Sequence, residues 1–324
     1  MTKRRGVQQA AFALAALGLA ASPAMAETRM TLKSAKAGSS YYVMMVQLAE
    51  ALKKASDGEV LPTVEESQGS VQNVKEAAVR PGNFLFTSPP SLIDAAAKGE
   101  KPFEGSSFEG VRTLFPMPFI TIHLVVSETS GIENVEGLAG SQFIAGGKGT
   151  FCEGRTKKLL DVLDLTGKVE IVDVELDAAS NAMRNGKVDG FATCSSHPTP
   201  QLTELATTTP LKVLGLSAEE RQKIVSLDPL SGPITIAAGT YKGQDEAVET
   251  VGVPVGAYGT TGMDEETAYL VTKSFWDWKD RLAAEQPWWD AVEPALVAQL
   301  GATIHPGAAR YYREQGVELP ESMR

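Results

Sequence analysis

The chain is poor in the residues that build catalytic and metal sites. It holds only three histidines and two cysteines in 324 residues, and neither H-E-x-x-H nor a G-x-S-x-G nucleophile elbow occurs. The glycine-rich residues 147–150 fit neither the phosphate-loop order nor the dinucleotide fingerprint G-x-G-x-x-G. His123 lies within an apolar strand pattern, where a structural role is the expectation. These absences disfavour an enzyme, and they predict no cofactor and no metal.

Basic residues and long hydrophobic runs are also scarce. The apolar run at residues 10–21 is shorter than the roughly 20 residues of a membrane-spanning helix. It follows three basic residues and precedes Ala24-Met25-Ala26, the organisation of a secretory signal cleaved after Ala26. Cleavage leaves 27 basic against 40 acidic residues, a net charge of about −13, which disfavours nucleic acid as a partner. We therefore expect a periplasmic protein without stable membrane insertion.

Strand and helix patterns alternate along the rest of the chain. Apolar residues recur at helical spacing between short apolar runs, which is typical of an α/β fold with a mostly parallel sheet. The predicted strands cover residues 30–34, 60–64, 83–86, 120–126, 142–145, 169–172, 190–193, 211–215 and 250–258. Residues 265–315 are predicted to be helical. Two similar α/β blocks result.

Small polar loops follow several of the predicted strands. They cover residues 34–42, 67–70, 87–90, 146–153 and 194–198. Each could simply cap the helix that follows it. In open α/β sheets, however, ligands bind beyond the carboxyl ends of strands, where helix N-termini favour anions. Five such loops and few catalytic groups therefore favour one shared crevice that binds an anion.

The two cysteines both lie beside these loops. Cys152 is in the first turn of a predicted helix, and Cys194 follows a predicted strand. An exported protein permits a disulfide between them. The alternatives are two reduced, buried side chains, or a reactive thiol at Cys152 that would make the chain a secreted cysteine-dependent hydrolase.

The chain resembles the TAXI family of solute receptors, which serve tripartite ATP-independent periplasmic (TRAP) transporters. The resemblance runs over essentially the whole mature chain. It is carried by SSYYVMMVQLAEAL, ESQGSVQNV, GIENVEGLAG, NGKVDGF, PTPQLTELATTTPLKVL, AGTYKGQDEAVETVGVPV, HPGAARYYRE and the glycine turn before Glu153.

This resemblance implies a two-lobed, type II periplasmic-binding-protein-like fold with a hinge between the lobes. Lobe one is expected at residues 27–121 and 235–324, and lobe two at 122–234. The receptor would close around a small carboxylate such as glutamate, glutamine or 2-oxoglutarate and deliver it to a TRAP membrane component. Together with the loop analysis, it predicts ligand contacts at Ser39, Ser40, Tyr41, Gly69, Ser70, Ser88, Gly149, Thr150, Cys152, Glu153, Cys194 and Ser195.

Several positions depart from the family pattern. Cys152 and Cys194 replace threonines at neighbouring loops, which favours a bridge across lobe two. Phe151 adds bulk to the second glycine turn, so the ligand could differ from those of the family. The same architecture would also suit the binding component of an ABC importer or of a two-component sensor.

Overall fold

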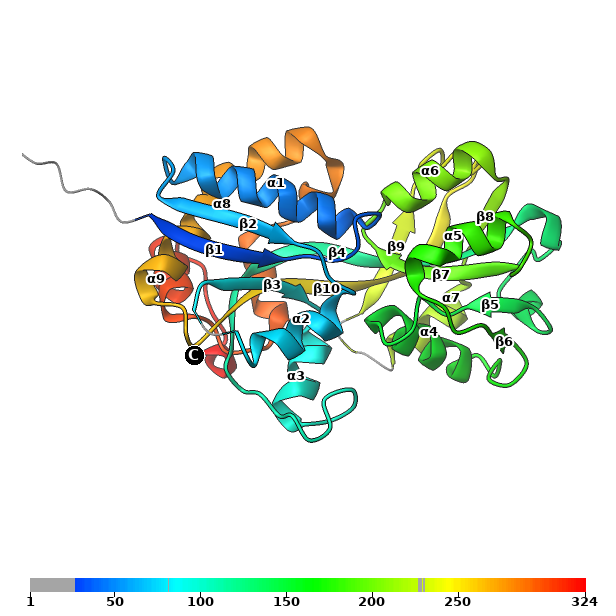
Figure 1. Ribbon diagram of the computed structural model, residues 1–324, viewed down its shortest axis with the longest axis horizontal. Helices are drawn as coiled ribbons and strands as arrows, with labels where there is room; N and C mark the ends of the chain where they lie inside the picture. The colour runs from blue at the N-terminus through cyan, green and yellow to red at the C-terminus, as the bar shows by residue number, and fades with distance from the viewer. Residues whose placement is uncertain (1–26, 81, 227–228, 230) are drawn as a thin grey trace, which may run out of the picture.

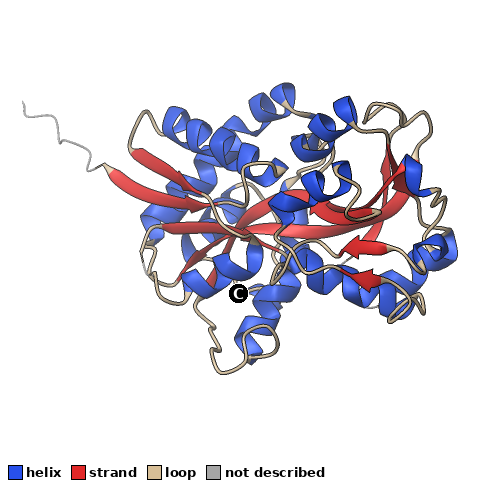
Figure 2. Ribbon diagram, turned by 45° about the vertical axis from the view of Figure 1, so that its right-hand side comes forward, coloured by secondary structure: helices blue, strands red, loops and turns tan. Residues whose placement is uncertain are grey.

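The computed structural model describes residues 27–80, 82–226, 229 and 231–324. The predicted signal segment and its cleavage point after Ala26 lie outside the described residues. Helices lie on both sides of the strands (Figure 2), as the alternating sequence pattern predicts.

The strands join in one mixed sheet. Its main path runs β2-β1-β3-β10-β4-β7-β5-β6, with β8 paired to β4 and β9 paired to β10. The strands are β1 (Thr28–Lys33), β2 (Val60–Glu65), β3 (Phe84–Ser88), β4 (Val111–Ser127), β5 (Gln142–Ile144), β6 (Glu170–Ile171), β7 (Gly190–Ser195), β8 (Leu211–Leu214), β9 (Gly232–Ile236) and β10 (Val248–Thr260). The pairs β1–β2, β1–β3, β5–β6 and β5–β7 are parallel.

The α-helices follow the strands closely in the chain, which places their N-termini near strand ends. They are α1 (Ser40–Ala55), α2 (Ser70–Ala77), α3 (Pro90–Lys98), α4 (Phe151–Val162), α5 (Leu176–Arg184), α6 (Pro200–Thr208), α7 (Ala218–Val225), α8 (Glu265–Glu285) and α9 (Pro306–Glu314).

Two long antiparallel strands connect the two ends of the molecule. β4 has 17 residues and β10 has 13, and both pass from the left to the right of Figure 1. On the left lie β1–β3, α1–α3, α8 and α9, here called the first group; on the right lie β5–β9 and α4–α7, the second group. β10 contacts β3 at one end and β9 at the other. This is an α/β fold of two groups joined by long strands, as expected, whereas the lobe boundaries stay a prediction.

β4 begins nine residues before the strand predicted from the sequence. Pro116 and Pro118 make residues 111–119 resemble a break, because proline cannot donate to a strand ladder. In the structure this part of β4 pairs along one side with β10, and Pro116 lies opposite Gly256. Apart from a single bridge to Ile304, no strand among the described residues pairs with its other side, so the missing N–H groups cost little.

The apolar core forms several clusters of buried residues. One cluster, here called the α2–α3 cluster, is built on Val71, Phe84, Phe86, Leu92 and Phe103 of the first group. Another cluster packs the second group around residues of β7 and α6. The largest cluster follows α1, β4, β10 and α8 and continues into α4. Each group thus has a cluster of its own, and one continuous core runs through both groups along the connecting strands.

Candidate ligand-binding cavity

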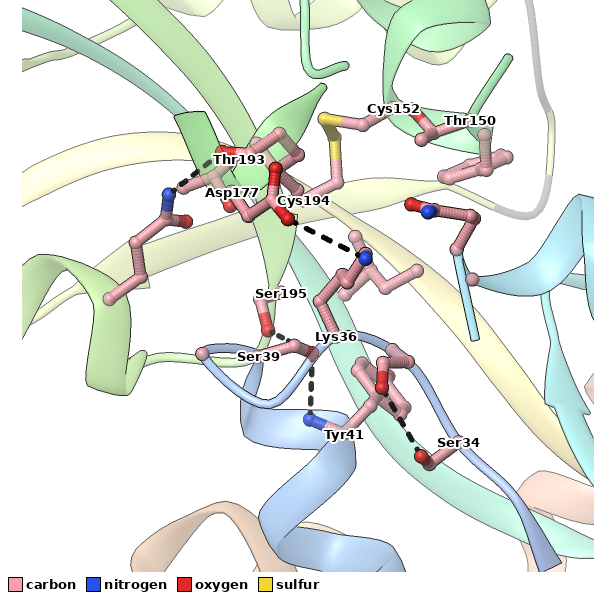
Figure 3. Close-up of a pocket in the computed structure, with 18 of the residues that line it drawn as sticks. Ser34, Lys36, Ser39, Tyr41, Thr150, Cys152, Asp177, Thr193, Cys194 and Ser195 are labelled. Atoms are coloured by element: carbon pink, nitrogen blue, oxygen red, sulfur yellow. Dashed lines mark hydrogen bonds and ion pairs between the residues drawn. A yellow bond between two sulfur atoms is a disulfide. The ribbon is translucent and has the colours of Figure 1, made fainter. Parts of the chain in front are cut away.

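A cavity of about 310 Å³ lies between the first and the second group. The loop after β1, the last residues of β3 and β7 and the N-terminal residues of α2, α4 and α5 meet there, as expected at the ends of strands in such a sheet. Hydroxyl side chains line it from both groups: Ser34, Ser39, Ser70, Thr87, Thr150, Ser180, Thr193 and Ser195. Figure 3 shows part of this lining.

The start of α1 touches the end of β7 across the cavity. Ser39 caps α1, and its hydroxyl accepts the Tyr41 N–H at 3.0 Å. Ser195 lies 3.4 Å from the Ser39 hydroxyl and 2.6 Å from the Ser40 hydroxyl, and it also accepts the Ser40 N–H at 3.1 Å. The predicted loops are therefore brought together, but Ser40 is buried in this contact and does not line the cavity.

Tyr41 contributes its ring to the cavity wall, while its hydroxyl is already bound. The hydroxyl donates to the carbonyl oxygen of Pro118, and burial raises the pKa of Tyr41 well above its ordinary value. A buried phenol of this kind stays neutral and keeps its proton in the existing hydrogen bond. Tyr41 thus supplies a flat wall and no free donor.

A network behind the lining holds three loops of the first group in register. The Ser67 hydroxyl donates to the carbonyl of Ser34 and accepts the Gly69 N–H, both at 2.9 Å. Asn73, fully buried in α2, donates to the same Ser34 carbonyl at 2.9 Å and to that of Thr87 at 3.3 Å. Gly69 has a φ of 102°, a conformation that favours glycine. Hydrogen bonds within the chain thus hold these loops in one conformation.

Cys152 and Cys194 form a disulfide in the cavity wall. Their Cα atoms are 5.4 Å apart, and the bridge links the first turn of α4 to β7 (Figure 3). Gly146 permits this arrangement, because a Cβ there would lie 2.6 Å from both Cβ and Sγ of Cys152. The disulfide leaves Cys152 without the thiolate that the hydrolase alternative requires.

Three further predicted contacts lie away from the cavity. The buried Ser88 hydroxyl donates to the carbonyl of Pro89 at 3.1 Å, and its neighbour Thr87 lines the cavity instead. Gly149 and Glu153 line a larger outer groove of about 1340 Å³ on the side of α3 and α4. Of the predicted residues, the structure places these in the cavity wall: Ser39, Tyr41, Gly69, Ser70, Thr150, Cys152, Cys194 and Ser195.

Glu153 is occupied by partners of its own. It accepts the Gly149 N–H at 2.6 Å and pairs with Lys157 at 2.6 Å. Burial opposes ionisation of Glu153, but the hydrogen bonds from Lys157 and from the Gly149 N–H outweigh it and hold its pKa below the ordinary value. The carboxylate therefore stabilises the start of α4.

The sequence analysis did not predict the group of charged residues at the cavity mouth. Lys36 and Asp177 face each other across the mouth, with Nζ and Oδ2 3.5 Å apart (Figure 3). Arg184 and Glu204 lie on α5 and α6 and are exposed. Only the spacing of residues 177, 181 and 184 on one helix face signals that α5 forms a wall.

The two histidines near β7 are held by hydrogen bonds within the fold. His123 donates from Nδ1 to the carbonyl of Thr121 at 3.1 Å, so its Nε2 accepts the Tyr241 hydroxyl at 2.9 Å. Burial lowers the pKa of His123 to about 3, with a smaller contribution from His197. The His197 Nδ1 lies 2.7 Å from the hydroxyl of Thr121. His123 is therefore neutral and structural, as its apolar context predicts.

Two groups of α/β structure joined by long strands, with a cavity between them, define the fold of periplasmic binding proteins. The periplasmic binding protein BugD superposes with a TM-score of 0.57 at 15% identity, covering 91% of this chain and 99% of its own. MatC from Rhodopseudomonas palustris, solved with bound malate, gives 0.55 at 15% identity, covering 89% and 97%. A putative L-cystine ABC transporter protein from Listeria monocytogenes gives 0.50 at 12%, covering 82% and 97%. At such identities the likeness defines the fold.

The sequence itself identifies the family. Residues 32–316 match the NMT1-like family, so this chain belongs to that family. Within the part of the chain that the structure describes, no helix combines the length and the apolar character needed to cross a membrane. The same described residues contain no group of three or more His, Cys, Asp or Glu side chains able to hold a metal ion.

Proposed function

We propose that this protein is an extracytoplasmic receptor that captures a small carboxylate-bearing metabolite in the cavity and delivers it to a TRAP membrane component. Glutamate, glutamine and 2-oxoglutarate are the expected kind of ligand. The observation that carries the proposal is the cavity itself, in which hydroxyl groups from both groups of the fold converge beside helix N-termini.

The chemistry of the lining suits an anion in a protein of negative net charge. Helix N-termini and hydroxyl donors stabilise a carboxylate locally through charge-assisted hydrogen bonds. Lys36 adds a cation at the mouth, where a bound carboxylate would compete with Asp177 for its ammonium group. The malate bound by MatC is a carboxylate in a related fold. Positive charge near the site would therefore attract an anionic ligand, although the net negative charge of the whole protein does not.

Delivery to a membrane partner requires that the loaded receptor differ from the empty one. Rotation of the two groups about β4 and β10 would open the cavity, and a ligand that contacts both groups would favour closure. An ABC importer remains the alternative partner, because the Listeria protein named above shares the fold. The class of membrane protein that is encoded beside this chain, a TRAP component or an ABC importer, distinguishes the two partners.

Ligand binding is tested first on protein that has been unfolded and refolded to remove bound metabolite. A ligand at 100 times its dissociation constant should stabilise the protein by about 2.7 kcal/mol, which a thermal-shift screen of amino acids, 2-oxo acids and dicarboxylates detects. If none of these compounds binds saturably, the proposal is refuted.

The site is tested by a matched pair of serine variants. Ser70→Ala should weaken binding by about 1–3 kcal/mol if its hydroxyl donates to a buried carboxylate. Ser88→Ala is the control, because the Ser88 hydroxyl is bound to Pro89 and does not line the cavity. Calorimetric titration of both variants with the compound found in the screen should show a loss for Ser70 alone.

A further inference from the structure

Phe151 occupies a special position between the cavity and the outer groove. It is the first residue of α4, it is half-buried, and its side chain lines both spaces. It also packs against the α2–α3 cluster, whose other described members belong to the first group and its adjoining strands and loops. Phe151 thus reaches from the second group onto the core of the first group.

The backbone on either side of Phe151 is held firmly. The single proton of the Thr150 hydroxyl is shared between the carbonyls of Gly146 and Gly147, both 2.8 Å away, and the hydroxyl oxygen accepts the Glu153 N–H at 3.1 Å. Cys152 on the other side is bonded to Cys194 of β7. The ring of Phe151 itself has no polar group, so apolar packing alone determines where it lies. Its removal therefore changes the space between cavity and groove with little effect on the turn.

We propose that the ring of Phe151 is the partition between the cavity and the outer groove, and that it sets the length of ligand the receptor accepts. This inference rests on the proposed function. A carboxylate held by the hydroxyl lining would extend toward the ring, which stops chains longer than the cavity of about 310 Å³ can hold. Beyond the ring the groove offers apolar side chains such as Leu92 and the cations Lys101 and Lys158. A second carboxylate on a longer chain would find a partner there.

The test is a length series of linear dicarboxylates, from succinate to sebacate, titrated calorimetrically into each protein. The wild type should prefer the short members. Phe151→Ala should shift the optimum to longer chains and raise affinity for the long members, relative to the short ones, by about tenfold, the effect of burying roughly two methylene groups. Phe151→Leu, which keeps apolar bulk, should lie between the two.

Phe108→Ala is the matched control for these variants. Phe108 is also a half-buried phenylalanine that packs against the α2–α3 cluster and lines the groove, but it does not line the cavity. Its removal should leave the preferred length unchanged. A preferred length that is the same in wild type, Phe151→Ala and Phe151→Leu would overturn the partition, while the wild-type titrations would still support the proposed function.

A second readout needs no ligand. The Cys152–Cys194 bridge lies in the cavity wall, so glutathione must reach the cavity to reduce it in the folded protein. The rate of reduction should rise several-fold in Phe151→Ala and stay at the wild-type value in Phe108→Ala. Equal rates in both variants would overturn the partition. If the wild type binds no carboxylate, the proposed function fails and this measurement still decides the role of Phe151.

Discussion

The Ser195 hydroxyl joins the two groups across the cavity, and its removal gives a quantitative test of that contact. Ser195 is 1% exposed and lies 2.6 Å from the hydroxyl of Ser40, whose N–H it also accepts at 3.1 Å. In Ser195→Ala the buried N–H and the buried hydroxyl of Ser40 both lose the Ser195 hydroxyl as their hydrogen-bond partner. We expect the free energy of unfolding to fall by about 1–3 kcal/mol, measured by urea unfolding.

A double-mutant cycle separates the contact from the general effect of removing a hydroxyl. Ser40→Ala keeps the N–H of Ser40 and removes only its hydroxyl, so the coupling with Ser195→Ala should be about 0.5–1.5 kcal/mol. Ser196→Ala is the matched control, because its similarly buried hydroxyl donates to the carbonyl of Phe119 at 2.6 Å and does not contact Ser40. A coupling between Ser40 and Ser195 no larger than that between Ser40 and Ser196 would refute the contact.

Two further predictions concern stability. Replacing Cys152 and Cys194 together by alanine should destabilise the protein by about 4 kcal/mol, the value that the chain-entropy model gives for a separation of 42 residues. Urea unfolding of the variant and of the oxidised wild type measures this loss, and a loss below about 1 kcal/mol would contradict the prediction. His123 has a pKa of about 3 in the folded protein and an ordinary value of 6.5, so the unfolded chain binds the proton more tightly. The contribution of His123 to stability should therefore be complete above pH 6.5 and fall by at most about 1.4 kcal/mol per pH unit below it. His123→Gln should remove this part of the slope in unfolding experiments between pH 6.5 and 4.5, while His197 and His305, whose pKa values burial also lowers, keep theirs.

The position of the cavity could be predicted because it depends on local chain geometry. Polar loops that follow parallel strands meet at one edge of a sheet, whichever side chains pack beneath them. Four of the five predicted loops accordingly line the cavity, and the fifth contributes Thr87 alone. The exact residues were harder to predict, because side chains alternate between the two faces of a strand and the register of the last residues of β3 cannot be read from the sequence. Thus Ser88 was predicted, whereas its neighbour Thr87 lines the cavity.

Other features depend on tertiary contacts that leave little trace in the sequence. β9 carries Pro233 and a short, half-exposed pattern, and it forms because β10 offers it an antiparallel partner. α7 begins with a capping box between Ser217 and Glu220, a signal present in the sequence, but its single buried residue Ile224 gives almost no apolar periodicity. At the charged mouth, Lys36 lies in a predicted loop, whereas Asp177 and Arg184 of α5 and Glu204 of α6 lie outside all of the predicted loops.

The contacts across the cavity bear on how tightly a ligand must bind. Ser39 and Ser195, predicted from the sequence to hold the ligand, lie 3.4 Å apart, and Lys36 pairs with Asp177 at 3.5 Å. The Lys36–Asp177 pair, in which Lys36 is half-buried and Asp177 exposed, contributes little to the proposed closure because solvent screens it, whereas the buried Ser40–Ser195 contact contributes about 1 kcal/mol. These contacts therefore favour the proposed closure of the empty protein only weakly. A carboxylate that met Lys36 and the hydroxyls of both groups would add bonds that exist only in the closed form, and its differential affinity would set the balance between open and closed receptor.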